Sequence, residues 1–349
     1  MTIRSRSVLA IGAAGMLLAA CSFSPTPSGS PRADEGSFAA DTGDLVVYSG
    51  RTEELIGPLI ERFSEATGVE VAVRYGDTSE MANLILTEGE NSPADVYFAQ
   101  DAGALGAVAD EGLLAELPAE TLDLVDERFR SPEGTWVGVS GRARVVVYNT
   151  DNVSEDELPD SIFGFTDPEW SGRIGWAPTN GSFQSFVTAL RVLEGEDRAR
   201  EWLEGIQANE PNVYEGNNPA LEAVIAGEID VAFINHYYLM QRLAEDPDVP
   251  AANYFVPDGG PGALVNVAGV GILETADQAD AAERLIAFLL SDEAQAYFAE
   301  ETKEYPLATG VAPDPELPPL GDLATPDIDL SDLSDLDGTL ELLQDVGIL

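Results

Sequence analysis

The sequence predicts an α/β fold in which mainly parallel sheets are flanked by helices. β-rich runs alternate with segments of helical periodicity along most of the chain, an order typical of parallel sheets with helices on their faces. The chain has 349 residues, of which 44% are hydrophobic. It is therefore long enough for two domains of ordinary size and apolar enough to bury a core in each.

The first half of the chain opens with a β-α-β pattern. The expected strands are 44–50, 69–76, 94–99 and 144–149, and the expected helices are 53–68, about 78–88 and about 102–111. In the first of these helices Ile56, Leu59, Ile60 and Phe63 recur at helical spacing, which indicates one buried face.

A second round of alternation follows. The expected strands are 172–178, 230–235 and 263–273, and the expected helices are 182–195, 197–209, 221–228 and one or two within 276–302. The tail carries leucines at intervals of three or four residues, namely Leu330, Leu333, Leu336, Leu340 and Leu343. This spacing predicts that the tail packs against the protein.

The N-terminus predicts export. Residues 1–20 have two arginines, an apolar stretch and small residues before Cys21, as in a secretory signal peptide. Leu18-Ala19-Ala20-Cys21 resembles the bacterial lipobox, so we expect cleavage before Cys21, a lipid on its sulfur, and anchoring to the outer face of the cell membrane. An uncleaved membrane helix is the weaker alternative, because the apolar run is short of the roughly 20 residues that a span needs. Residues 21–43 are rich in Ser, Pro, Gly and Ala, a composition typical of a flexible tether.

Composition excludes several classes of function. The chain has 63 acidic and 17 basic residues, a formal charge of -46, which argues against nucleic acid and anionic membrane surfaces as partners. With one histidine and one cysteine, zinc sites and cysteine nucleophiles are effectively excluded. Neither a phosphate-binding GxxxxGK[ST] loop nor a GxSxG elbow occurs, and no carboxylate pair is marked by its spacing for hydrolysis. These absences favour a binding protein over an enzyme.

Two adjacent tyrosines stand out in the stretch INHYYLM, residues 234–240. A strand ending at Asn235 and a helix starting near Tyr237 would place both phenols at the carboxyl edge of a sheet, where ligands of open α/β folds bind. Packing in the core is the ordinary alternative. Two phenol oxygens suit a hard trivalent cation such as Fe(III), whose charge can hold them as phenolates at neutral pH.

A helix start offers a second element. In APTNGSFQSF, residues 177–186, a turn leads into a helix, and the free N–H groups at such a start favour an anion. The alternative is ordinary N-capping by Asn180 or Ser182.

Several stretches together resemble a known family. VVYSGR, SPADVYFAQDAGAL, GRARVVVYNTD, GRIGWAPTNGSFQSFV, ANEPNVYEGNNPALEAV, INHYYL and KEYPL are similar to the ferric-ion-binding substrate-binding proteins of bacterial ABC iron transporters, the bacterial transferrins. The resemblance implies a two-lobed type II periplasmic-binding-protein fold, each lobe a mainly parallel sheet flanked by helices, joined by hinge strands. Lobe 1 would comprise 44–141 and about 262–308, and lobe 2 would comprise 142–261 and about 309–349.

The same resemblance implies the site. It makes Tyr237 and Tyr238 ligands of Fe(III), with carbonate or phosphate completing the coordination. The positions that match the anion-binding residues of the family are Asn180, Gly181, Ser182, Asn217 and Asn235.

Two positions depart from the best-known members. Thr52 and Gln100 stand where those members have a histidine and a glutamate, so we expect a more open site with Gln100 or Asp101 as candidates for an extra contact. Arg51 and Arg142 are unusual in so acidic a chain. They either form surface ion pairs or face the cleft and balance the anion and the phenolates.

These features together predict a function. We expect a monomeric, lipid-anchored receptor that captures Fe(III) and delivers it to the permease and ATPase subunits of an ABC importer. The alternative is the same two-lobed receptor binding an organic solute such as a sugar, polyamine or carboxylate, with the tyrosines as a stacking platform.

Overall fold

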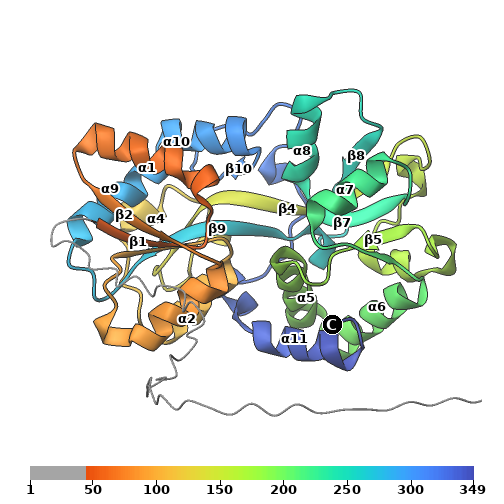
Figure 1. The fold of residues 1–349 in the computed structure, drawn as a ribbon, viewed down its shortest axis with the longest axis horizontal. Helices are drawn as coiled ribbons and strands as arrows, with labels where there is room; N and C mark the ends of the chain where they lie inside the picture. The colour runs from red at the N-terminus through yellow and green to blue at the C-terminus, as the bar shows by residue number, and fades with distance from the viewer. Residues whose placement is uncertain (1–44) are drawn as a thin grey trace, which may run out of the picture. The chain divides into compact units, whose positions relative to one another are not determined.

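The computed structural model describes residues 45–349, which belong to one compact unit. The signal peptide, tether and lipidation site predicted at 1–20, 21–43 and Cys21 lie outside the described residues. The strands are β1 (Leu45–Ser49), β2 (Val71–Tyr75), β3 (Val96–Ala99), β4 (Val137–Asn149), β5 (Ile174–Trp176), β6 (Asn212–Val213), β7 (Val231–Asn235), β8 (Ala251–Tyr254), β9 (Val265–Ile272) and β10 (Tyr305–Pro306) (Figure 1). The helices are α1 (Glu53–Thr67), α2 (Thr78–Glu88), α3 (Ala102–Asp110), α4 (Ala119–Leu122), α5 (Gly181–Glu194), α6 (Glu196–Ala208), α7 (Asn217–Ile225), α8 (His236–Glu245), α9 (Ala279–Leu289), α10 (Asp292–Tyr297) and α11 (Leu336–Asp345).

The strands form a mixed sheet. Their order is β2-β1-β3-β9-β4-β7-β5-β6, and β8 and β10 also pair with β4. The pairs β1–β2, β1–β3, β5–β6 and β5–β7 are parallel. Antiparallel pairs occur only where β4 or β9 takes part. The predicted α/β fold is confirmed, with the antiparallel pairs concentrated on the two long central strands.

Strand β4 is longer than the sequence predicts. Its first part, residues 137–143, pairs with β9, and its second part, residues 144–149, pairs with β7 and β8. Figure 1 shows β4 and β9 running side by side between the β1–β3 group and the β5–β7 group. The sequence prediction began only at residue 144 because glycines in the first part weaken a strand pattern. Gly138 is needed there, since a Cβ on it would lie 2.7 Å from the carbonyl oxygen of Phe129.

The hydrophobic core is divided into clusters. One cluster gathers around β1, β3, β9 and the helices α1, α3 and α9. A second gathers around β5, α5 and α6, and a third lies between β7, α7 and α8. Leu317, Leu330 and Leu333 pack in the first cluster, whereas Leu342 and Leu343 pack in the second. The division into two lobes, with the boundaries given above, stays a prediction.

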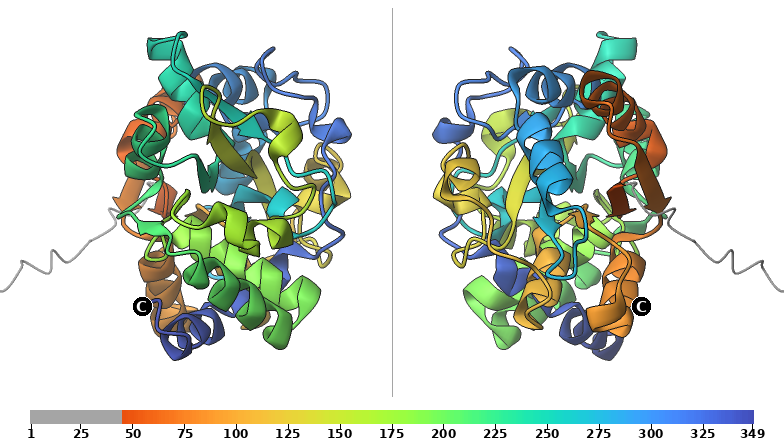
Figure 2. Two further views of the ribbon diagram at one scale, coloured as in Figure 1. Left: turned by 90° about the vertical axis from the view of Figure 1, so that its right-hand side faces the viewer. Right: turned by 90° about the vertical axis from the view of Figure 1, so that its left-hand side faces the viewer.

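The leucine-rich tail packs against the protein, as its spacing predicts. We call residues 330–345 the C-terminal strap. The strap begins as a short 3-10 helix, Leu330–Ser334, which lies so close to α3 that a Cβ on Gly103 would come within 2.3 Å of the Leu333 carbonyl oxygen. It continues as α11, which Figure 2 shows in dark blue at the lower edge of the molecule. A 2.7 Å hydrogen bond between the Thr188 and Thr339 hydroxyls holds α11 against α5. The strap therefore contacts elements of both the first and the second cluster.

The helices of residues 45–349 are too short or too polar for a membrane span.

Candidate functional site

A polar cavity of about 710 Å³ lies among the ends of the strands and the starts of the helices. Most of the predicted site residues line it: Gln100, Asp101, Arg142, Asn180, Gly181, Ser182, Asn235, Tyr237 and Tyr238. Elements from both halves of the chain contribute to its wall, as does the strap at Leu333–Asp337. The structure thus brings together residues as far apart in sequence as Thr52 and Asp337.

The tyrosine pair sits at the junction of β7 and α8. β7 ends at Asn235 and α8 begins at His236, so the two tyrosines occupy the first turn of the helix. Their rings stack with centroids 4.3 Å apart and an interplanar angle of 28°, and both rings line the cavity. The two phenols are thus presented to one space rather than to opposite faces.

His236 fixes this junction. Its ring is fully buried; Nδ1 accepts a hydrogen bond from the Ala143 N–H at 3.1 Å, and Nε2 donates to the Lys303 carbonyl at 3.0 Å. Burial lowers the pKa of His236 to about 4, so the ring is neutral at physiological pH. The only histidine in the chain therefore holds the start of α8 in place and does not face the cavity.

The Tyr237 phenol is protonated in the absence of a ligand. Burial, and then the neighbouring Tyr238, raise the pKa of Tyr237 well above its ordinary value, and the Arg142 guanidinium opposes this in part. A ligand that binds phenolate must therefore supply enough positive charge to displace the proton.

The start of α5 faces the same cavity. The Asn180 side chain caps the helix, since its Oδ1 accepts from the Ser182 N–H at 3.0 Å and from the Ser182 hydroxyl at 2.6 Å. Asn217, at the start of α7, donates from Nδ2 to Asn180 Oδ1 and Ser182 Oγ at 3.3 and 3.2 Å. Nothing lies within 4 Å of the position where a Gly181 side chain would begin. Capping and an open helix start therefore occur together, and Asn217 supports the loop without lining the cavity.

Two arginines of β4 line the cavity. Arg142 and Arg144 are only 3% and 4% exposed, and they point the same way because residues i and i+2 share a face of a strand. Arg142 donates to the Gln100 carbonyl, and Arg144 donates to the Phe233 carbonyl at 2.7 Å. Nε of both residues and Nη1 of Arg144 have no hydrogen-bond partner among the described residues. Burial lowers the pKa of Arg144 to about 9, which nearby Tyr238 opposes.

Arg51 is neither on the surface nor in the cavity wall. It is 1% exposed and makes a two-pronged ion pair with buried Glu304, at 3.1 and 2.8 Å. Burial alone would raise the pKa of Glu304, but Arg51, Arg142 and the hydrogen bonds to the carboxylate hold it below its ordinary value. Both alternatives considered for Arg51 therefore differ from its observed place, which is a buried structural pair.

The remaining predicted contacts also border the cavity. Asp101 caps α3 by accepting from the Ala104 N–H at 3.0 Å, and burial raises its pKa. Gln100 and Thr52 also line the wall. Among residues 45–349 no group of three or more His, Cys, Asp and Glu side chains could hold a metal. A metal in this cavity would depend on the oxygens of the phenols and of a bound anion.

Sequence reasoning missed Arg144 and the strap. Arg144 stands two residues after Arg142, so the period of a strand could have placed both on one face. Nothing in the tail indicated that Leu333–Asp337 would line the cavity, because that placement depends on packing against α3 and α5.

A mixed sheet with two long central strands, flanked by helices and bordering a polar cavity, is an architecture typical of solute-binding proteins. The family described as "Bacterial extracellular solute-binding protein" matches residues 79–330, and this chain belongs to it. Members of this family are carriers, so the prediction of a binding protein rather than an enzyme is confirmed.

Individual relatives are more specific. The chain is 35% identical over 312 residues to the "Major ferric iron-binding protein" of Neisseria meningitidis serogroup B, covering 87% of this chain and 93% of that protein. The structure resembles that of iron-bound HitA from Pseudomonas aeruginosa, with a TM-score of 0.80, 36% identity, and coverage of 87% and 99%. It also resembles IdiA (FutA) of Trichodesmium in complex with iron and citrate, with a TM-score of 0.78, 31% identity, and coverage of 88% and 100%. The predicted resemblance and the periplasmic-binding-protein fold are confirmed.

Proposed function

We propose that this protein is the substrate-binding component of an ABC transporter and captures Fe(III) in the polar cavity with the phenolates of Tyr237 and Tyr238. The observation that carries the proposal is the stacked pair of phenols, both lining one cavity beside the open start of α5. The names of the relatives, which are ferric iron-binding proteins, support the same cargo.

The chemistry follows from the charges. Fe(III) prefers anionic oxygen ligands, and its charge displaces the phenol protons. A synergistic anion, carbonate or phosphate, occupies the start of α5 at Asn180, Gly181 and Ser182, with Asn235 as a further contact. Asn217 holds Asn180 and Ser182 in place by its hydrogen bonds. The N–H groups of the helix start and the unpaired Nε–H of Arg142 match the charge of the anion. Gln100 or Asp101 contributes an extra contact.

Delivery requires closure and a partner. The lobes 44–141 plus 262–308 and 142–261 plus 309–349 close on the metal and shield it from water. The closed receptor, a monomer held to the outer face of the membrane by a lipid on Cys21, passes iron to the permease and ATPase subunits.

A spectroscopic titration tests the iron site. Wild-type protein titrated with Fe(III)-nitrilotriacetate in carbonate or phosphate buffer should develop a visible phenolate-to-iron absorption band. Tyr237→Phe and Tyr238→Phe should each weaken the band by about half, since each removes one of two donors, and the double variant should lack it. Tyr75→Phe, which removes a phenol of β2 outside the cavity wall, is the matched control and should keep the band. A colourless wild type that binds no iron would refute the proposal.

Proton release gives a second readout. Because an ordinary phenol is protonated at neutral pH, capture by two phenolates releases two protons. The iron affinity should therefore rise by roughly a factor of 100 per pH unit below the phenol pKa, after correction for the chelator. Each single variant should halve the logarithmic slope.

An organic solute remains the second candidate. The cavity volume of about 710 Å³ is within the range of small-molecule sites, and the stacked rings offer a platform. Calorimetry with sugars, polyamines and carboxylates against chelated Fe(III) separates the two, because heat from an organic solute without a coloured iron complex would favour this candidate.

A further inference from the structure

Two helices that begin at the polar cavity are tied together by the C-terminal strap. α3 begins directly after Gln100 and Asp101, and α5 begins at Gly181, in the predicted anion-binding turn. The strap packs against both helices, and its middle part, Leu333–Asp337, lines the cavity. Any movement that widens the cavity between α3 and α5 must therefore stretch the strap or detach it.

The anchor of the strap on α3 is a close backbone contact. Gly103 and Gly106 stand about one turn apart on this helix, and a Cβ on Gly106 would come within 2.5 Å of the Ser331 carbonyl oxygen. Leu330 and Leu333 are buried in the first hydrophobic cluster. This end of the strap is therefore held by packing and by apolar burial.

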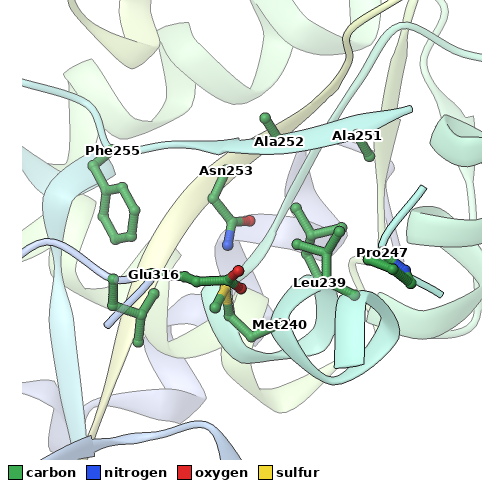
Figure 3. A pocket seen from close by; sticks show the side chains of 10 residues that line it. Leu239, Met240, Pro247, Ala251, Ala252, Asn253, Phe255 and Glu316 are labelled. Carbon is green, nitrogen blue, oxygen red and sulfur yellow. The ribbon is translucent and has the colours of Figure 1, made fainter. Parts of the chain in front are cut away.

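The segment that precedes the strap is held as well. The Lys303 ammonium pairs with the Asp314 carboxylate at 3.0 Å. The segment then passes α8, where Figure 3 shows Glu316 beside Met240 at an apolar pocket of about 350 Å³. The chain is thus fixed on the far side of the molecule before the strap reaches the cavity.

The anchor of the strap on α5 is an arginine clasp, formed by Arg191 and Asp335. Arg191 donates from Nη1 to the Asp335 carbonyl at 2.9 Å and from Nη2 to the Asp335 carboxylate at 2.8 Å. Nη1 also donates to the Thr339 hydroxyl at 2.9 Å, and Nε donates to Glu196 at 2.6 Å. Because the Asp335 side chain is 59% exposed, water competes for this contact, and the clasp is the weaker of the two anchors.

The length of chain between the anchors limits how far they can separate. Leu333 on α3 and Asp335 in the clasp are two residues apart, so their Cα atoms can lie at most about 7 Å apart. When the clasp opens, the next fixed point is Thr339, whose hydroxyl is 2.7 Å from that of Thr188. Four more residues then span the gap, which adds about 6 Å if they stay helical and about 14 Å if they unwind.

We propose that Arg191 is a positioning residue that latches the strap, restrains the widening of the cavity, and so sets how fast Fe(III) enters and leaves. The restraint follows from the clasp and the length of the chain, whereas the role in iron exchange rests on the proposed function. Arg191 does not line the cavity, so it acts through the strap and not on the cargo. A clasp that is the same with and without cargo changes the rates of entry and exit equally and leaves the affinity unchanged.

Hydrogen exchange followed by mass spectrometry tests the latch without iron. Arg191→Met removes the clasp. Asp335→Asn removes its charge but keeps the cap of α11, because an asparagine oxygen also accepts from the Gly338 N–H. The strap amides should exchange roughly tenfold faster in Arg191→Met and roughly threefold faster in Asp335→Asn. The amides of α9 should exchange as in the wild type.

Stopped-flow absorbance tests the role in iron exchange. Iron is supplied as Fe(III)-nitrilotriacetate and removed with excess ethylenediaminetetraacetate, and the phenolate-to-iron band reports both steps. Arg191→Met should raise both rate constants about tenfold and change the iron affinity by less than about twofold. The matched control is Arg200→Met, which removes another ion pair of the strap, Arg200–Asp345 at 3.3 Å, outside the cavity wall. It should leave both rates unchanged.

Three results would overturn the latch: wild-type strap exchange in Arg191→Met, wild-type iron rates in that variant, or rates that rise as much in Arg200→Met. A loss of affinity through the release rate alone would also overturn it, because the strap would then belong to the binding wall. A wild type that binds no iron, together with faster strap exchange in Arg191→Met, would remove the iron proposal and leave the restraint standing.

Discussion

Arg51 and Arg144 are both buried arginines, yet their surroundings differ completely. Nε has no partner in the described chain in either residue. Arg51 has both terminal nitrogens bonded to the Glu304 carboxylate, whereas Arg144 has only Nη2 bonded, to the Phe233 carbonyl, and no counter-ion. A buried charge without a counter-ion is costly unless a ligand supplies one. The difference teaches that the paired region around Arg51 stabilises the fold, whereas the open region around Arg144 leaves unpaired donors beside the cavity.

The largest expected effect breaks the paired region. Glu304→Gln leaves Arg51 buried without a counter-charge, so the free energy of unfolding should fall by about 3–5 kcal/mol. Urea denaturation followed by circular dichroism measures it. Arg51→Met combined with Glu304→Leu removes both charges and should recover most of the loss. A Glu304→Gln change below about 1 kcal/mol would mean that the pair contributes little to stability.

An intermediate effect concerns the junction between the regions, where His236 lies. Its folded pKa of about 4 is below the ordinary 6.5, so between these values the unfolded chain binds a proton that the folded chain does not. The stability contribution is fully present above pH 6.5, falls as the pH drops toward 4, and changes no further below that. We expect a loss of about 3 kcal/mol across this window.

Chemical denaturation at several pH values measures this loss. The difference between wild type and His236→Gln isolates it from the titration of the many carboxylates, because glutamine does not titrate. A difference that is independent of pH would show that His236 is not buried as a neutral ring.

The smallest effect on stability is expected in the open region. Arg144→Met removes an incompletely paired buried charge, so the free energy of unfolding without ligand should change by less than about 1 kcal/mol. Iron affinity in carbonate buffer should nevertheless fall roughly tenfold or more, because a charge-assisted contact is lost. Arg173→Met, at a partly exposed ion pair outside the cavity wall, is the control. Destabilisation without loss of affinity would reverse the contrast with Arg51.

Much of the fold was predictable from local patterns. The strand Val231–Asn235 and the helix His236–Glu245, which flank the tyrosines, follow from an apolar run and from the change of apolar spacing after it. The short edge strand β6 and the strand β8 were not predicted, because neither Asn212–Val213 nor Ala251–Tyr254 has a distinct alternating pattern.

The site was predictable only in part. Tyr237, Tyr238 and the start of α5 carry local signals, and the structure lines one cavity with them. The place of Arg51 depends on Glu304, which is 253 residues away, and no local pattern reports such a distant partner. The unpaired N–H donors of Arg144 likewise could not be predicted, because they depend on which residues surround the side chain in the folded protein.

The crossing of the C-terminal strap has a practical consequence for anyone shortening this chain. The family match ends at residue 330, where a boundary drawn from that match alone would fall. A cut there would strip Leu333–Asp337 from the cavity wall, and it would also uncover the glycine-lined surface of α3 and the apolar side of α5. Such a fragment would retain every expected ligand residue, but its cavity would lack one wall and its surface would expose apolar side chains that favour aggregation.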